Sequence, residues 1–247
     1  MTTQPQSFSK GALLYSGKAK NLYATQEPNV VIAQYRDDVT AFNGEKKDSI
    51  AGKGVLNNRF TEHFFDVLSK ANFNEHHFVS RLSDTEQAIK KVSIIPLEVV
   101  VRYYAAGSLV KRLGLTRGEK LKQTLVEFYW KSDALGDPLL GDGHIDLLGL
   151  ASEQERAILI AKAKQVGDIL TAYFKTHSLM LIDFKLEFGR LPDGTIVLAD
   201  EISPDTCRLW DETTKDSFDK DVFRESKGDL GDSYRALAKR IGLNLVG

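Results

Sequence analysis

Charged and apolar residues alternate in the first part of segment 181–205, and this alternation is the clearest chemical signal in the chain. Asp183, Lys185 and Glu187 are separated by single apolar residues, which is the period-two pattern of a half-buried strand. The turn sequence at 192–195, Pro-Asp-Gly-Thr, then predicts a hairpin. The segment therefore presents three ionisable side chains on one face of a strand.

The predicted hairpin brings two carboxylates together. A two- or four-residue loop pairs Leu191 with Ile196 and sets Glu187 opposite Asp200, whereas a three-residue loop shifts this register by one. Opposed carboxylates repel one another, and a cation between them removes the repulsion. Oxygen ligands of this kind suit Mg²⁺, which usually takes one or two carboxylates plus substrate phosphates. Lys185, on the same face, is suited to hold an anionic substrate.

The same pattern is also typical of a solvated sheet face with mixed charges. The segment 203–208, Ser-Pro-Asp-Thr-Cys-Arg, favours a functional site instead. It places an acidic and a basic side chain directly after the two carboxylates, where they would make a poor core.

Two other segments could bind anions. GKAK at 17–20 predicts a hairpin tip whose glycine and lysines could contact phosphates. Its spacing is not that of a Walker A loop, and taken alone the segment favours a solvated tip. Arg102 interrupts the apolar run 96–104 near its end, and Ser108 follows at the expected N-cap of a short helix. This second arrangement fits either a phosphate seat or an ordinary cap beside a surface arginine.

The periodicity of the remaining chain predicts the elements that position these residues. Strands are expected at 13–15, 22–24, 30–35, 78–82, 87–92, 96–104 and 125–130, and helices at 53–69, 152–175, 218–224 and 229–241. Residues 131–146 are expected to form a long loop. In the helix at 152–175, the residues expected to face the core are Ile158, Val166, Ile169, Leu170 and Tyr173. The histidines at 63, 76 and 77 are expected at the surface or as caps.

Strands dominate the first part of the chain, and strands and helices mix in the rest. This order predicts an α+β fold with two lobes. Residues 1–96 would form an antiparallel, β-rich nucleotide-binding lobe, and residues 97–247 a larger α+β lobe with the metal and substrate site. A cleft between them, like those of ATP-grasp enzymes and kinases, would hold a nucleotide between lysines and metal ligands, as phosphoryl transfer requires.

The composition excludes several classes of protein. The 247 residues include 42% hydrophobic and 27% charged residues with a net charge of −1, so no overall charge favours nucleic acid or a membrane surface as a partner. One cysteine excludes a disulfide framework and a cysteine-rich zinc site. The polar N-terminus is unlike a signal peptide, and no apolar run is long enough to span a bilayer. These features predict a cytoplasmic protein.

Six segments together resemble the SAICAR synthetase family. They are GKAKNLY (17–23), the segment 49–60, PLEVVVRYYAAGSLVKRLG (96–114), LIDFKLEFG (181–189), DEISPDTCRLWD (200–211) and DKDVFR (219–224). GKAK alone is a weak signal, but the six segments occur in the family's order and span nearly the whole chain, at the length of the short bacterial form. The set is therefore highly specific.

The resemblance implies a reaction of de novo purine synthesis. ATP, L-aspartate and CAIR (5-amino-1-(5-phosphoribosyl)imidazole-4-carboxylate) would give SAICAR, ADP and phosphate, with Mg²⁺. The family mechanism begins with attack of the CAIR carboxylate on the γ-phosphate. The aspartate amine then displaces phosphate from the acyl phosphate. A homodimer is the assembly that the resemblance suggests.

The resemblance also implies roles for matching residues. ATP would be bound by Gly17, Lys18, Ala19 and Lys20, with Leu97 and Val99 lending backbone groups to adenine from an inter-lobe hinge. Mg²⁺ would be held by Glu187 and Asp200. CAIR would be bound by Arg102, Ser108, Arg208 and Arg224, and Asp183 and Lys185 would lie beside its ribose and reacting carboxylate. For L-aspartate, the loops 37–43 and 131–137 are both candidates.

The chain departs from the family pattern at a few positions. Tyr103 and Tyr104 replace a polar pair, Cys207 replaces a serine, and Phe42-Asn43 replaces a small or acidic residue. Cys207 is expected to act as a serine substitute and not as a nucleophile, because no histidine is near it in sequence. Two other functions are alternatives. A small-molecule kinase on the same scaffold would keep Lys20, Glu187 and Asp200. A nucleotide-sensing or RNA-binding module would use the segments 46–47 and 111–112, and the net charge disfavours RNA.

Overall fold

The first of two large sheets is formed by the N-terminal part of the chain. The computed structural model describes residues 8–41 and 46–245. Five antiparallel strands form this sheet in the order β1 (Leu13–Ser16), β2 (Lys20–Ala24), β3 (Val30–Tyr35), β7 (Glu86–Lys90) and β6 (Phe78–Arg81). The predicted hairpin tip at 17–20 is confirmed, with the Gly17 N–H donating to the carbonyl oxygen of Lys20 at 2.8 Å. A separate two-stranded sheet, β4 (Asp38–Ala41) with β5 (Lys46–Ser49), was not predicted.

The second sheet contains the longest strands. Its order is β10 (Leu139–Leu140), β9 (Lys120–Trp130), β8 (Ser93–Tyr104), β11 (Leu179–Arg190) and β12 (Ile196–Ala199), and β13 (Cys207–Asp211) also pairs with β11. All these pairings are antiparallel. β8 and β11 are central because each is paired on both sides. Both alternate large apolar side chains with polar ones, so one face of the sheet is buried in the core and the other carries charge.

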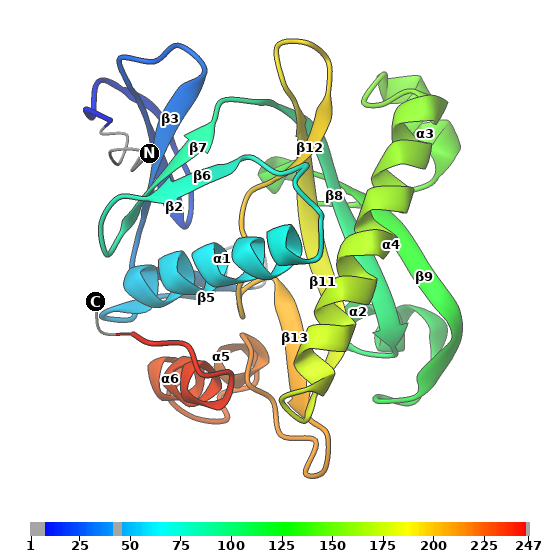
Figure 1. The fold of residues 1–247 in the computed structure, drawn as a ribbon. Coiled ribbons are helices and arrows are strands. Elements are labelled where there is room, and N and C mark those ends of the chain that lie inside the picture. The colour runs from blue at the N-terminus through cyan, green and yellow to red at the C-terminus, as the bar shows by residue number, and fades with distance from the viewer. Residues whose placement is uncertain (1–7, 42–45, 246–247) are drawn as a thin grey trace.

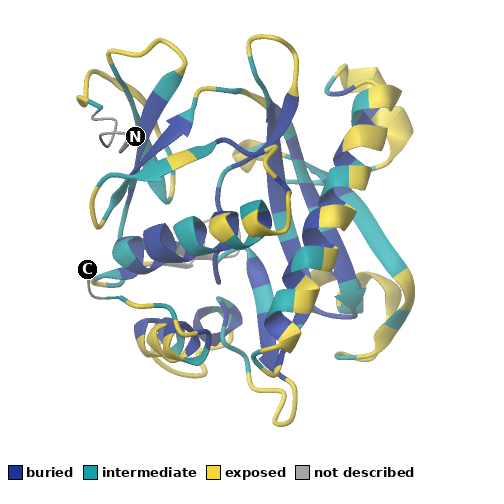
Figure 2. Cartoon of the chain, in the orientation of Figure 1, coloured by how far each residue is buried: buried dark blue, intermediate teal, exposed yellow. Residues whose placement is uncertain are grey.

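Two long helices cover the apolar faces. α4 (Glu153–Lys175) lies across the second sheet beside β11 and β8, and α1 (Lys53–Lys70) lies between the first sheet and the C-terminal helices (Figure 1). The predicted capping box at the start of α4 is confirmed, since the Glu155 N–H donates to Ser152 Oγ at 3.2 Å and the Ser152 N–H donates to Glu155 Oε2 at 2.8 Å. Figure 2 shows that the side of α4 facing the sheet is buried.

The predicted inward face of α4 was partly wrong. Val166 and Leu170 are fully buried, but Ile158 is 40% exposed and Leu159 occupies the core position. The face that packs on the sheet continues through Ala163 and Phe174 at helical spacing. Ile158 is apolar but lies one residue, about 100° of helix rotation, away from that face.

The shorter helices correct three other predictions. They are α2 (Gly107–Leu113), α3 (Asp142–Leu148), α5 (Asp221–Arg224) and α6 (Leu230–Arg240). The expected loop at 131–146 contains a 3₁₀ turn, β10 and the start of α3, and the helix expected from 218 begins only at Asp221. Ser108 is not the N-cap of α2, because that position is taken by Ala106.

The chain passes from one sheet to the other at residues 91–92, between β7 and β8. Residue 96, where the sequence predicted a lobe boundary, lies inside β8. The antiparallel α+β class is confirmed. Among the described residues, no helix is both long enough and apolar enough to cross a membrane.

Candidate active site

A cavity of about 610 Å³ lies between the two sheets. One part is apolar and includes Leu22, Val31 and Ile89 from the first sheet. The other part is lined by the charged side chains of Lys18, Lys20, Glu98, Lys131, Lys185, Glu187, Asp200 and Glu201. An apolar region that meets convergent charges is the usual character of a small-molecule site, and it suits a ligand with a flat ring and a phosphate tail.

The hairpin that carries Glu187 and Asp200 has a different register from the one predicted. Glu187 pairs with Ala199, and Arg190 with Ile196. Residues 191–195 lie between the strands, and the Leu191 N–H donates to the Thr195 carbonyl oxygen at 2.9 Å, which leaves a three-residue loop at 192–194. Gly194 in this loop has a φ of 86°, a left-handed conformation that suits a three-residue hairpin loop. The predicted opposition of Glu187 and Asp200 was therefore wrong by one residue.

Two carboxylates do oppose each other across strands, but they are Glu187 on β11 and Glu98 on β8. Lys185 joins them, with Nζ 2.8 Å from Glu187 Oε1 and 3.0 Å from Glu98 Oε1. The same Nζ lies 3.8 Å from Asp200 Oδ2. Burial alone would lower the pKa of Lys185, but attraction to Glu187, Glu98 and Asp200 outweighs it, and the pKa is raised. Lys185 is thus a cation held among three carboxylates.

Asp200 is also held from the first sheet. It leaves β12 with a φ of 60°, and its carboxylate forms an ion pair with Lys20 of β2. Lys20 Nζ also lies 2.8 Å from Glu201 Oε2. Burial would raise the pKa of Asp200, but Lys20 and Lys185 lower it, so this carboxyl group is ionised at neutral pH. The predicted phosphate-binding hairpin and the predicted metal ligand therefore meet at one place.

His76 and His77 are buried, contrary to the surface positions expected from the sequence. They are 8% and 4% exposed, and burial lowers the pKa of each to about 4. His77 Nε2 donates to the Asp200 carbonyl oxygen at 2.9 Å. The segment containing both histidines joins β12 through a parallel bridge between His76 and Leu198. Nothing in the local sequence indicated this long-range pairing.

The charge at this end of the cavity suits a divalent cation. Four carboxylates, those of Glu98, Glu187, Asp200 and Glu201, surround three ammonium groups, those of Lys20, Lys131 and Lys185. Within 8–41 and 46–245, no cluster of three or more His, Cys, Asp or Glu side chains could hold a metal by itself. Oxygen donors that need a ligand's phosphates to complete the shell are typical of Mg²⁺.

The other end of the same β11 face is a network of arginines and carboxylates. Asp183 Oδ2 lies 2.5 Å from Arg102 Nη1 and 2.8 Å from Arg208 Nη1. Asp221 joins Arg208 Nε at 2.8 Å to Arg224 Nη1 at 2.6 Å. Ser108 Oγ lies 3.4 Å from Arg102 Nη2. Burial alone would lower the pKa of Arg102 and of Arg208, but their carboxylate partners raise it.

This network has more positive than negative charge. Glu127 accepts from Arg102 Nε at 2.7 Å and from Arg112 Nη2 at 2.6 Å. Four guanidinium groups thus face three carboxylates. The predicted anion-binding residues Arg102, Ser108 and Arg208 lie together, and Arg224 joins them through a shared carboxylate. The arrangement suits a phosphate monoester.

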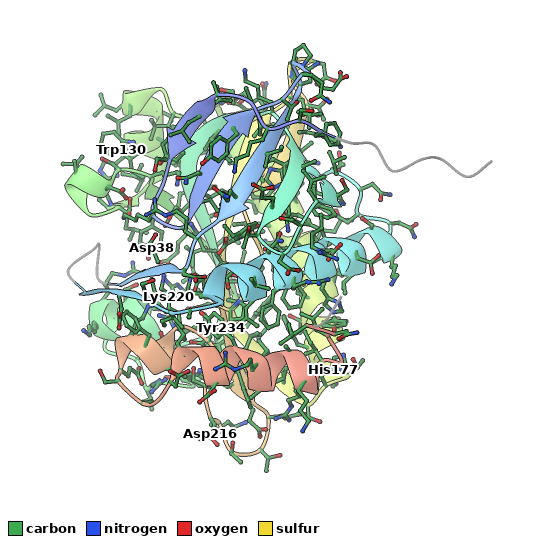
Figure 3. All side chains as sticks on the ribbon, turned by 90° about the vertical axis from the view of Figure 1, so that its left-hand side faces the viewer. Asp38, Trp130, His177, Asp216, Lys220 and Tyr234 are labelled. Atoms are coloured by element: carbon green, nitrogen blue, oxygen red, sulfur yellow. The ribbon has the colours of Figure 1, made fainter. Side chains whose placement is uncertain are left out.

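A third cluster borders the cavity near α1 and α6. Asp205 Oδ2 lies 2.5 Å from Lys53 Nζ, and Tyr234 donates its hydroxyl to Asp205 Oδ1 at 2.5 Å. Lys220 lines the cavity, and no ion pair within 4 Å is found for it among the described residues. Burial lowers the pKa of Lys220 despite the attraction of Asp205, and repulsion from Lys53 lowers this pKa further. Figure 3 shows Lys220 and Tyr234 in the layer between α1 and α6.

Comparison with known proteins decides the family. The SAICAR synthetase family model matches residues 13–241. The chain belongs to the SAICAR synthetase family. It is 55% identical over 234 residues to the phosphoribosylaminoimidazole-succinocarboxamide synthase of Lysinibacillus sphaericus, covering 95% of this chain and 99% of that protein.

Solved structures of SAICAR synthetases have the same fold. The crystal structure of the Ehrlichia chaffeensis phosphoribosylaminoimidazole-succinocarboxamide synthase has a TM-score of 0.91 and 39% identity, covering 94% of this chain and 99% of that one. A SAICAR synthetase in complex with ADP has a TM-score of 0.88 and 44% identity, covering 92% and 96%. The sequence-based assignment to the family is confirmed.

The residues predicted to bind ATP divide into two groups. Gly17, Lys18, Ala19 and Lys20 all line the cavity. Leu97 and Val99 are not among the lining residues, and they are 1% and 0% exposed in the main core. In their neighbourhood the cavity is lined by Glu98, Ile94 and the connection at 90–92. The contact of Leu97 and Val99 backbone groups with adenine stays a prediction.

Some site residues were not identified from the sequence. Glu201 directly follows Asp200 in the segment 200–211, and this position could have identified it as a site residue. Glu98 becomes visible only through strand pairing. Lys131 begins the 131–137 loop that was a candidate for L-aspartate, but its ion pair with Glu187 becomes visible only through loop packing. Cys207 is buried, and burial raises the pKa of its thiol, which supports a serine-like role. The departure at residues 42–43 lies outside the described residues.

Proposed function

We propose that this chain joins the amine of L-aspartate to the carboxylate of CAIR, using ATP, to form SAICAR, ADP and phosphate. One feature of the site supports this proposal most directly. A cluster of lysines and carboxylates from both sheets closes one end of an apolar cavity, in a chain of the SAICAR synthetase family. Such a cluster can hold MgATP beside a carboxylate substrate.

In this proposal, ATP lies between the two sheets, in a two-lobed cleft of ATP-grasp or kinase type. Adenine occupies the apolar part of the cavity, next to the connection at 90–92. The phosphates contact the backbone of Gly17 and the ammonium groups of Lys18 and Lys20. Glu187 and Asp200 would hold Mg²⁺. When bound, this ion would neutralise charge on the phosphates and favour transfer of the γ-phosphoryl group.

CAIR lies along the β11 face from Asp183 to Glu187. The rise of a strand makes this distance roughly 13 Å, enough for a phosphoribosyl imidazole to extend from one end to the other. Arg102, Ser108, Arg208 and Arg224 bind the CAIR phosphate, and Asp183 accepts from a ribose hydroxyl. The CAIR carboxylate then lies beside Lys185.

Catalysis proceeds in two steps. A carboxylate oxygen of CAIR attacks the γ-phosphorus, the bond to the bridging oxygen of ADP breaks, and an acyl phosphate forms. The aspartate amine then attacks the acyl carbon, phosphate leaves, and the amine loses a proton. Lys185 and Lys20 orient the reacting anions and stabilise charge that develops on the transferred group.

For L-aspartate, we place one carboxylate at Lys220. This lysine is a half-buried cation that lines the cavity, and Asp205, the carboxylate that attracts it most, is already bound by Lys53, Asn57 and Tyr234. A partly desolvated cation of this kind is stabilised by an anionic ligand. Asp137 of the predicted 131–137 loop also lines the cavity and stays a candidate.

Oxygen transfer tests the acyl phosphate directly. CAIR labelled with ¹⁸O in its carboxylate should deliver one labelled oxygen to inorganic phosphate, detected by mass spectrometry. Unlabelled phosphate formed together with SAICAR would contradict the acyl phosphate while leaving the overall ligation in place.

For the whole molecule, the corresponding proposal is a cytoplasmic homodimer without nucleic-acid or membrane partners. The dimer follows from the family resemblance. Light scattering coupled to size-exclusion chromatography should give twice the 27.6 kDa chain mass, and a monomer mass would overturn it.

A further inference from the structure

The backbone of Asp200 has a conformation that residues other than glycine rarely adopt. Its φ is 60°, immediately after the last residue of β12. A left-handed conformation costs a non-glycine residue about 1–2 kcal/mol, and it persists only when the surrounding structure holds it. Here it turns the Asp200 carboxylate toward Lys20 and Lys185.

His77 contacts Asp200 at the point where this conformation is fixed. Its Nε2 lies 2.9 Å from the Asp200 carbonyl oxygen. A carbonyl oxygen can only accept, so Nε2 carries the proton and donates. The ring is 4% exposed, which shields the hydrogen bond from water.

The backbone of His77 is itself held rigidly. Its N–H donates to the Leu198 carbonyl oxygen at 2.9 Å, and its own carbonyl accepts from the Lys90 N–H at 2.7 Å. The Leu198 N–H donates in turn to the Glu75 carbonyl oxygen at 2.8 Å. The backbone that carries the imidazole is therefore hydrogen-bonded both to the first sheet, at Lys90, and to β12, at Leu198.

We propose that His77 is a positioning residue for MgATP: its hydrogen bond to the Asp200 carbonyl holds the left-handed backbone that aims the Asp200 carboxylate into the cavity. The inference rests on the proposed role of Asp200 as a Mg²⁺ ligand. His77 does not touch the reacting atoms in this account. It acts only through Asp200.

His76 is a matched control within the same segment. It is 8% exposed, and its Nε2 lies 2.8 Å from Ser69 Oγ. It does not line the cavity, and its hydrogen bond goes to α1 and not to Asp200. Replacing it removes a buried imidazole of the same kind without removing the contact to Asp200.

The first experiment compares His77→Leu, His77→Gln and His76→Leu. Calorimetry measures the apparent affinity for Mg²⁺ in the presence of ADP, and steady-state kinetics give kcat. His77→Leu leaves a buried acceptor unpaired, so Mg²⁺ affinity and kcat should each fall by about tenfold or more. The amide of glutamine can replace the Nε2–H donor, and His77→Gln should recover most of this loss.

His76→Leu should lower the melting temperature by about as much as His77→Leu but keep both Mg²⁺ affinity and kcat near wild type below the melting transition. An equal loss of Mg²⁺ affinity in both leucine variants would overturn the proposal, and so would failure of His77→Gln to recover function while folded.

A double-mutant cycle gives the closing test. If His77 acts through Asp200, His77→Leu should have no further effect on Mg²⁺ affinity or kcat in an Asp200→Asn background. The proposal would be overturned if His77→Leu caused the same loss of Mg²⁺ affinity and kcat in the Asp200→Asn variant as in the wild type. The Mg²⁺–ADP titration needs no CAIR or aspartate, so a failure of the proposed ligase reaction would be seen separately from a failure of this cycle.

Discussion

Individual charged residues in the cavity depend on one another. Lys185 lies among Glu98, Glu187 and Asp200, so removal of any one carboxylate changes the environment of a half-buried cation. The sequence identified Lys185, Glu187 and Asp200 because period-two spacing and family motifs mark them. It did not identify Glu98 or His77, because their roles arise from pairing with distant strands.

Neutralising either proposed metal ligand should lower turnover strongly. Glu187→Gln or Asp200→Asn removes a preorganised negative charge and should reduce kcat by about 10²-fold or more. Asp193→Asn at the exposed tip of the same hairpin is the control and should keep normal turnover. Near-wild-type kcat with an ordinary Mg²⁺ requirement in the first two variants would remove these residues from the metal role.

The two buried histidines should make stability depend on pH. Their pKa values are about 4 in the folded chain, lowered by burial and by Lys90 or Lys20, against about 6.5 when exposed. The unfolded chain therefore binds more protons between these values, and the free energy of unfolding should fall as pH drops from about 6.5 to about 4.

Denaturant titrations at several pH values check this effect. The double variant His76→Gln/His77→Gln should show a shallower fall in the free energy of unfolding over the same range. If the variant and the wild type lose stability in parallel on acidification, the histidines do not account for the acid sensitivity.

At the scale of elements, helix α4 depends on a close contact with β8 and β11. A Cβ at Gly167 would lie 2.1 Å from the Tyr103 hydroxyl oxygen and 2.9 Å from Cζ of Phe184. Tyr103, one of the departures from the family pattern, therefore packs in the core against a glycine, with its ring centroid 6.3 Å from that of Phe184.

Gly167→Ala should destabilise the protein by about 1–3 kcal/mol through overpacking, even though alanine favours a helix. Thermal or chemical unfolding measures the change, and adding Tyr103→Phe should recover part of it by removing the hydroxyl. A neutral or stabilising Gly167→Ala substitution would show that the helix and strands can separate there without cost.

The elements themselves were largely predictable, but their pairing was not. Alternation and helical periodicity gave α1, α4, α6 and most strands to within a few residues. The hairpin register failed because it depends on whether the loop has two, three or four residues, and Pro-Asp-Gly-Thr permits all of them. β4, β5 and α3 were missed because they are only four to seven residues long and each contains turn-forming Asp, Ser or Gly.

At the scale of the molecule, the proposed site assigns separate regions to three substrates. Family motifs suggested the proposed ATP and CAIR residues before any geometry was known, and for L-aspartate they suggested only the loops 37–43 and 131–137. Lys220 becomes a candidate only when its place in the cavity and its lack of a close ion pair within the described chain are seen.

Substitutions in these regions should separate the substrates kinetically. Arg208→Ala should raise the KM for CAIR most, Lys18→Ala the KM for ATP, and Lys220→Met the KM for L-aspartate. Each loss of a charged contact should change the affected KM by about tenfold or more. Equal effects of one substitution on all three KM values would contradict the assignment of that residue.

The most direct test of the account is ADP release from MgATP and CAIR, measured with and without L-aspartate while SAICAR formation is followed by absorbance. We predict that ADP and SAICAR rise together only when aspartate is present, and that Asp200→Asn suppresses both. Sustained ADP release without aspartate, with a phosphorylated small molecule accumulating instead of SAICAR, would contradict the ligase and point to a kinase on this fold.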